Sequence, residues 1–100
     1  MSESITIISQ QELDQLWLEG NMPFKRAAGL LVVTIVHDVP ARDPRYLGGR
    51  SRVLTFDTRS GQHLGTIHQV VLPDGAIPHD HPKDYTRRDC SRVRVAGEER

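Results

Sequence analysis

The hydrophobic positions at the start of the chain change from the period of a strand to that of a helix. Residues 4–8 include four β-branched side chains in succession, which favours a short strand. Leu13, Leu16 and Trp17 then recur three and four residues apart, so they share one face of a helix. The pattern predicts a helix over residues 10–19.

Residues at both ends of this helix have the chemistry of caps. Ser9 and Glu12 have the spacing of a capping box, in which each side chain bonds the backbone amide of the other residue. Gly20 is expected to end the helix in the left-handed conformation, and Pro23 is expected to prevent its continuation.

The next apolar run, residues 30–36, has hydrophobic side chains at both odd and even positions. A strand that is buried on both faces has this pattern, so we expect a central strand of a sheet. Proline cannot donate to a central ladder, which ends the strand near Pro40. Residues 40–50 then form a polar loop rich in Pro, Gly and Arg, long enough in a small domain to suggest a functional role.

Two further runs, residues 52–57 and 62–72, flank a turn at 58–61 and predict a β-hairpin. Pairing of these strands creates one core face and one mostly polar face. The core face would hold Leu54, Phe56, Ile67 and Val71, and the polar face Val53, Thr55, Asp57, Leu64, Thr66 and His68. A second turn is expected at 73–75, and residues 92–95 alternate as a last edge strand would.

These elements predict an α+β fold in two layers, with one N-terminal helix packed on a mainly antiparallel sheet of about four strands. The N-terminal strand and helix would occupy residues 4–20 and the sheet residues 29–95. A length of 100 residues fits one domain, 1–100.

Composition excludes several classes of protein. The 13 Lys and Arg balance the 13 Asp and Glu, which argues against a highly basic nucleic-acid binder and an acidic disordered tail. One cysteine, Cys90, cannot make an intramolecular disulfide. No signal peptide is visible and no apolar run approaches the ~18–20 residues of a membrane helix, so we expect a cytoplasmic protein without a membrane partner.

His79 and His81 are the most suggestive pair for a metal site. Alternate residues of an extended segment point the same way, so both imidazoles can reach one divalent ion. Asp80, Asp84 and a strand histidine such as His68 are the candidates to complete the site.

The segment around this pair, VLPDGAIPHDHP at residues 71–82, resembles the first metal motif of cupins. The resemblance implies a role for His79 and His81 as metal ligands. Cupins continue with a glutamate and a second motif that contains another histidine. Here the nearest acid is Asp84 and no histidine follows His81, so two of the expected ligands are missing.

A second constellation consists of His37, His63 and His68 with Arg52. Antiparallel pairing of the predicted strands would bring His37, Arg52 and His68 to the same end of the sheet. Histidine can act as general base or acid and arginine can hold a phosphate, and metal-independent RNA cleavage needs these roles. Small toxin ribonucleases share this arrangement of helix and sheet at the level of layout alone.

Arginines are frequent in the polar loop and just after it. Arg45 and Arg50 are candidate ligands for an anion. Interleaved aspartates such as Asp38 and Asp43 offer local ion pairs as the alternative.

Three classes of function therefore remain. The leading hypothesis is a small module that binds a protein partner or self-associates and needs no cofactor, because no catalytic set is complete. The first alternative is a toxin-type ribonuclease that acts on RNA through His37, Arg52 and His68. The second is a protein that binds a divalent metal at His79 and His81.

Overall fold

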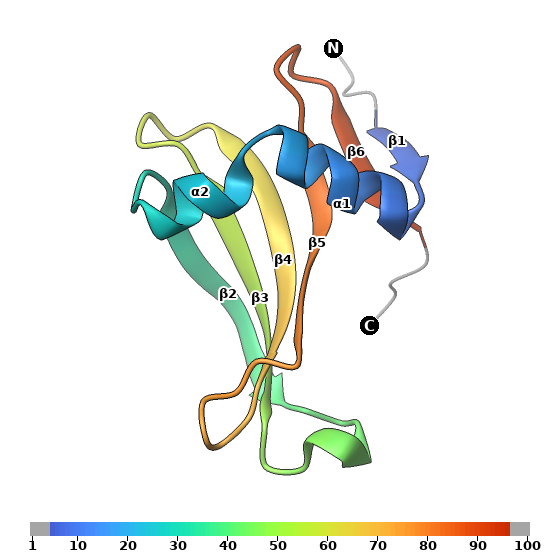
Figure 1. Cartoon of the computed structure of the whole chain (residues 1–100), viewed down its shortest axis with the longest axis vertical. Coiled ribbons are helices and arrows are strands. Elements are labelled where there is room, and N and C mark those ends of the chain that lie inside the picture. The colour runs from blue at the N-terminus through green and yellow to red at the C-terminus, as the bar shows by residue number, and fades with distance from the viewer. Residues whose placement is uncertain (1–4, 97–100) are drawn as a thin grey trace.

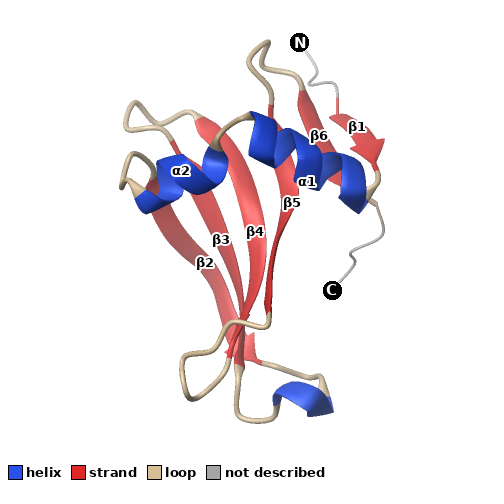
Figure 2. Cartoon of the chain, viewed as in Figure 1, coloured by secondary structure: helices blue, strands red, loops and turns tan. Residues whose placement is uncertain are grey.

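The computed structural model describes residues 5–96, which form a single sheet with both α-helices in front of one face (Figures 1 and 2). The sheet has six strands in the order β1-β6-β5-β4-β3-β2. The elements are β1 (Ile5–Ile8), α1 (Gln10–Glu19), α2 (Met22–Ala27), β2 (Val32–Pro40), the 3-10 turn η1 (Pro44–Tyr46), β3 (Arg50–Asp57), β4 (His63–Val71), β5 (His79–Thr86) and β6 (Arg92–Val95). The α+β prediction is confirmed, whereas the expected four strands and one helix are too few.

Helix α1 begins and ends where the sequence predicts. The Ser9 hydroxyl accepts from the Glu12 amide at 3.1 Å, and Glu12 accepts from the Ser9 amide at 3.0 Å. Donation to the Glu12 carboxylate from the Ser9 amide, and from the Ser9 hydroxyl at 3.1 Å, lowers the pKa of Glu12. The prediction of a left-handed Gly20 is wrong, because its φ is −79° and Asn21 takes the left-handed conformation instead. This position favours glycine for a different reason, because the Cβ of any other residue would overlap the Tyr85 hydroxyl.

Pro23 does not end helical structure, as the sequence had suggested. It lies in the first turn of α2, where a proline's missing N–H costs no helical hydrogen bond. Met22 at the start of this second helix is 1% exposed and packs with Trp17 in the core. The short helix therefore extends the layer that α1 begins.

Strand β2 lies at the edge of the sheet, not at its centre. It pairs with β3 alone, and its side chains are almost all exposed, including Val33 at 47% and Ile35 at 51%. A bulge between Ile35 and His37 interrupts its register with β3. The prediction of a central strand buried on both faces is wrong for the isolated chain.

Strands β3 and β4 form the predicted hairpin, and their helix-facing side chains make the core. Leu54, Phe56 and Ile67 are 5% exposed or less and pack against Trp17 and Met22. The Trp17 and Phe56 rings meet edge to face with centroids 5.8 Å apart. The core face was thus assigned correctly for these three residues.

Strand β5 begins directly after Pro78 and contains Pro82. It pairs with β4 from His79 to Tyr85, but with β6 only from Asp84 to Thr86. Pro82 lies in the part of β5 that has no β6 residue opposite it. The N–H that proline lacks therefore removes no hydrogen bond between β5 and β6. Strand β6 is not an edge, because β1 pairs with it in parallel along its other side.

Candidate metal site

Three histidines meet on the face of the sheet opposite α1 and α2, called here the open face. In the antiparallel register of β4 and β5, His68 lies opposite His81, and Val70 lies opposite His79. Side chains alternate along each strand, so these histidines point away from Ile67 and the core. Two neighbouring strands thereby supply all three imidazoles.

The three rings are close enough for one ion. One ligand nitrogen from each of His68, His79 and His81 lies within 4.8 Å of the others, and the ring centroids are separated by 4.1, 5.3 and 5.8 Å. Among residues 5–96 this is the one group of three or more metal-ligating side chains at such distances. All three histidines are half-buried.

These distances are compatible with zinc after a small closure of the rings. Zinc–nitrogen bonds of about 2.0–2.1 Å in tetrahedral geometry place the ligand nitrogens ~3.4 Å apart. The nitrogens therefore have to approach one another by up to ~1.4 Å, which side-chain rotation supplies. Three protein ligands leave one tetrahedral position for another molecule.

Ser51 on β3 provides support behind one ligand. Its hydroxyl oxygen lies 2.9 Å from Nε2 of His68. A hydrogen bond to one ring nitrogen fixes the orientation of a metal-binding histidine, and the ion is then bound by the other nitrogen. Val70, which lies between Ser51 and His79 in the register, is 4% exposed and gives the site an apolar border.

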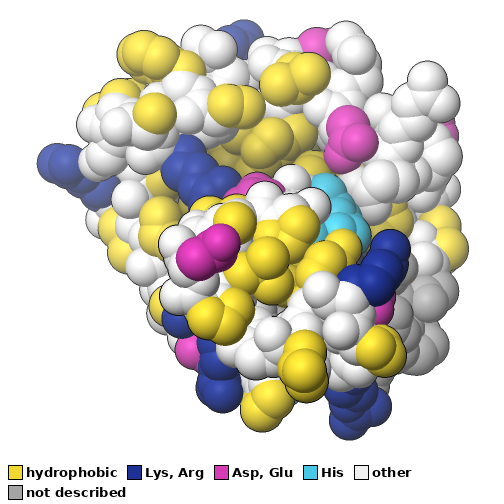
Figure 3. All heavy atoms as spheres, turned by 60° about the horizontal axis from the view of Figure 1, so that its bottom comes forward, with side chains coloured by type: hydrophobic (Ala, Val, Ile, Leu, Met, Phe, Trp, Pro, Cys, Tyr) yellow, Lys and Arg dark blue, Asp and Glu magenta, His cyan; other side chains and the backbone are white. Residues whose placement is uncertain are grey.

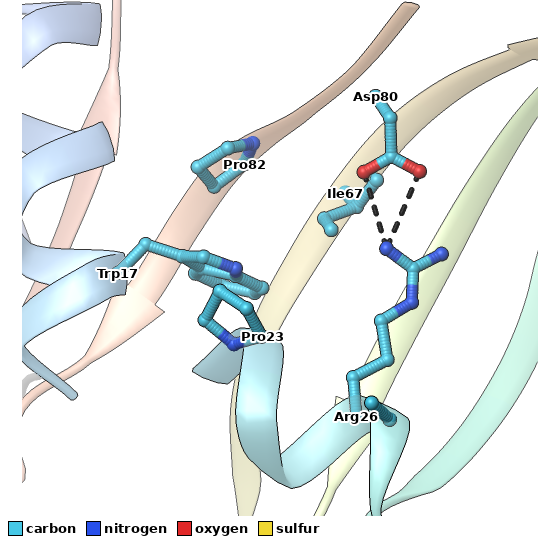
Figure 4. Close-up of a pocket in the computed structure, with 7 residues that line it drawn as sticks. Trp17, Pro23, Arg26, Ile67, Asp80 and Pro82 are labelled. Atoms are coloured by element: carbon cyan, nitrogen blue, oxygen red, sulfur yellow. Dashed lines mark hydrogen bonds and ion pairs between the residues drawn. The ribbon is translucent and has the colours of Figure 1, made fainter. Parts of the chain in front are cut away.

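Asp80 lies between the two β5 histidines in sequence but on the other face of the sheet. Its carboxylate accepts from Gln69 at 2.8 Å. It also accepts from Arg26 at 3.1 and 3.3 Å, as Figure 4 shows. This ion pair borders a pocket of about 510 Å³ beside Trp17. Asp80 is therefore not a ligand, but its anchoring fixes the strand that presents His79 and His81.

Asp84, the other acidic candidate, is engaged by a different histidine. His63 places Nε2 3.0 Å from Asp84 and Nδ1 3.3 Å from Asp57. Both ring nitrogens of His63 thus face carboxylates at the far end of the open face. The sequence grouped His63 with His37 and His68, whereas in the structure His63 contacts Asp57 and Asp84 instead.

The residues suggested for RNA cleavage are divided between the two faces. His37 lies opposite Val53, which in turn lies opposite His68, so His37 and His68 share the open face ~10 Å apart. Arg52 lies opposite Gln69 on the other face and reaches Asp38 at 3.3 Å. The structure does not bring Arg52 to the two histidines.

Both candidate anion ligands are paired with aspartates. Arg45 reaches Asp43 at 2.6 Å, and its hydrogen bonds lower the pKa of Asp43 to about 2. Arg50 donates to Asp38 at 2.9 Å, and this bond is the main reason that the pKa of Asp38 is lowered. An anion at either arginine would compete with a carboxylate already in place.

Figure 3 looks toward the end of the sheet that lies at the bottom of Figure 1. Histidine side chains are visible there at the surface, next to hydrophobic ones. In the described part of the chain, no helix has the length and hydrophobicity needed to cross a membrane.

Comparisons of the chain with protein-family models, with curated proteins and with solved structures each find no match. The functional argument therefore depends on the geometry of this molecule. The histidine cluster is the part of that geometry with the most specific chemistry.

Proposed function

We propose that this protein binds one divalent transition-metal ion, with zinc as the expected ion, through His68, His79 and His81. The observation that supports this is the convergence of three imidazole nitrogens within 4.8 Å, drawn from two strands. Imidazole is a preferred ligand of zinc, and ligands on strands are held more precisely than ligands on loops.

The chemistry of the site follows from its ligand set. Three neutral imidazoles leave the ion with its full double positive charge, so the open position attracts water or an anionic ligand. A site with three protein ligands and one exchangeable position is typical of zinc that acts on a bound molecule, whereas structural zinc is closed by four protein ligands.

The stated geometry favours this function over the other two classes. A ribonuclease built on His37, Arg52 and His68 would need Arg52 on the open face, where it does not lie. A binding module without a cofactor does not require three histidines to converge beside a supporting serine. The metal site accounts for both of these features.

The test is a titration of the purified full chain with Zn²⁺ by calorimetry, and with Co²⁺ by visible absorption. We expect one ion per chain, and a loss of affinity of at least ~100-fold in His68→Ala, His79→Ala and His81→Ala, because each removes a ligand of the first coordination sphere. His37→Ala and His63→Ala are matched controls, since both histidines lie on the same face outside the cluster.

Two results would contradict the proposal. One is a protein that binds neither ion at stoichiometric ratio. The other is binding that survives the three cluster substitutions and disappears with His37→Ala or His63→Ala. Circular dichroism of each variant distinguishes lost ligands from lost folding.

A further inference from the structure

The outer side of β2 combines two features that are seldom left exposed together. Its backbone donors and acceptors on that side have no partner strand among residues 5–96. Its side chains are apolar on both faces, with Val32 46%, Val33 47%, Ile35 51% and Val36 57% exposed. The sequence of this strand is that of a central strand, although the single chain places it at an edge.

We infer that β2 pairs with β2 of a second copy of this chain, antiparallel about a twofold axis through Thr34. In that register Val32 lies opposite Val36 of the other copy, and Val33 lies opposite its Ile35. Thr34 lies opposite Thr34 of the other copy. Each cross-strand pair is then apolar–apolar or Thr–Thr, which are favourable neighbours in a sheet. The two sheets join into one continuous sheet of twelve strands, six from each chain.

The strand lacks the devices that usually protect an edge. The segment 32–36 contains no charge and no proline. The acidic residue further along, Asp38, is neutralised within its own chain by Arg50 and Arg52. The bulge lies at Val36, between Ile35 and His37, so regular pairing is confined to the residues around Thr34 and the pair of Val32 with Val36 marks its limit.

The flanking surface enlarges this interface. Leu30, just before β2, is 49% exposed, and Phe24 on the helix that leads into it is 61% exposed. A standard stable interface buries ~800 Å² per partner, which five paired residues alone do not supply and these flanking side chains help to reach.

The opposite edge of the sheet offers a matched comparison. Strand β1 is also an edge with exposed isoleucines, Ile5 at 46% and Ile7 at 54%, but it is only four residues long. A short strand is itself a protected edge. The proposal therefore commits to β2 and does not extend to β1.

The first experiment measures the mass of the full chain by sedimentation or light scattering at concentrations up to ~200 μM, where weak dimers are populated. We expect a dimer for the wild type and for Ile7→Lys, and a monomer for Val33→Lys, which places a charge in the proposed interface. Val33 and Ile7 are similarly exposed in the single chain, so both variants should fold.

The second experiment tests the register by disulfide formation in a Cys90→Ser background. Thr34→Cys should give a covalent dimer on mild oxidation, because directly opposed Cα atoms lie within the ~4.4–6.8 Å that a disulfide spans. Val32→Cys should not, because in this register residue 32 faces residue 36 of the other copy and the two cysteines are ~13 Å apart. The proposal does not depend on the metal site.

Any of three outcomes would overturn this inference. The wild type is a monomer over the whole concentration range, which would leave the edge for a different partner or for none. The dimer survives Val33→Lys and is lost in Ile7→Lys, which would move the interface to β1. The dimer forms, but Val32→Cys crosslinks more readily than Thr34→Cys.

Discussion

The two faces of strand β4 differ in what they contact and in how tightly they do so. Toward the helices, Gly65 and Ile67 lie against Trp17 and are buried. On the open face, Thr66 and His68 are half-buried and have other polar side chains beside them. One strand therefore supports the fold on one face and presents the chemistry on the other.

The same alternation holds in β5. Asp80 and Pro82 belong to the helix-covered face, where they border the pocket beside Trp17, while His79 and His81 belong to the open face. Substitutions on the open face can thus alter ligand binding at little expense to folding, whereas those on the helix face act on folding first. The following predictions test this separation.

The largest effect is expected for Phe56→Ala. Phe56 is fully buried, and its ring meets Trp17 edge to face. Its removal leaves a cavity and should lower the free energy of unfolding by about 3–5 kcal/mol, measured by chemical denaturation. Thr55→Ala, one residue away on the open face, should cost less than about 1 kcal/mol. Equal losses in the two variants would argue against the distinction between the faces.

A smaller loss is expected for Gly65→Ala. A Cβ at this position would lie 2.5 Å from Trp17 Cζ3 and 2.9 Å from the Asp84 carbonyl oxygen, so the indole or the strand must move. Overpacking of this kind costs about 1–3 kcal/mol in the free energy of unfolding. The control is Thr66→Ala, which removes atoms from the open face. A Gly65→Ala protein as stable as the wild type would show that Trp17 packs less closely than described.

The smallest effect on stability is expected for Ser51→Ala. Without metal, the free energy of unfolding should change by less than about 1 kcal/mol, because Ser51 lies on the open face. Zinc affinity, measured by calorimetry, should nevertheless fall by about 10–100-fold, because the serine orients His68 from 2.9 Å. Unchanged affinity would mean that Ser51 does not support the ligand. A large loss of stability would contradict the separation of the two faces.

Local patterns in the sequence predicted the parts of the fold that depend on local physics. The capping box of Ser9 and Glu12 determines the first turn of α1 wherever the helix packs, so its boundaries were correct. The β3–β4 hairpin was also predictable, because two alternating runs flank a turn in which Gly61 has a φ of 96°.

The errors arose where the same residue type has two uses. Pro23 was interpreted as a terminator, although proline is equally suited to the first turn of a new helix. Pro82 is a poor residue for a paired strand, yet it lies in β5 at a position that β6 does not pair with. The apolar run of β2 predicts a central strand because it is hydrophobic on both faces, yet in the single chain only β3 pairs with it.

The candidate site was predictable in part. The spacing of His79 and His81 indicates a shared direction in any extended segment, and His68 is the strand histidine that the sequence offers to complete the set. The sequence alone does not show that Asp80 is excluded from the ligand set. That follows from the pairing of β5 with β4, in which Gln69 and Arg26 bind Asp80 on the other face of the sheet. Ser51 was missed, since its contact with His68 depends on the pairing of a third strand.

The turn that joins β4 to β5 determines more than the path of the chain. Leu72 and Ala76 close it through a 2.8 Å backbone hydrogen bond, and Gly75 within it has a φ of 90°. Because side chains alternate with every residue, a shift of β5 by one residue along β4 would exchange the two faces of β5. His79 and His81 would then enter the pocket beside Trp17, and Asp80 would face solvent. The turn therefore has to deliver β5 to β4 in the one register that keeps His79 and His81 beside His68.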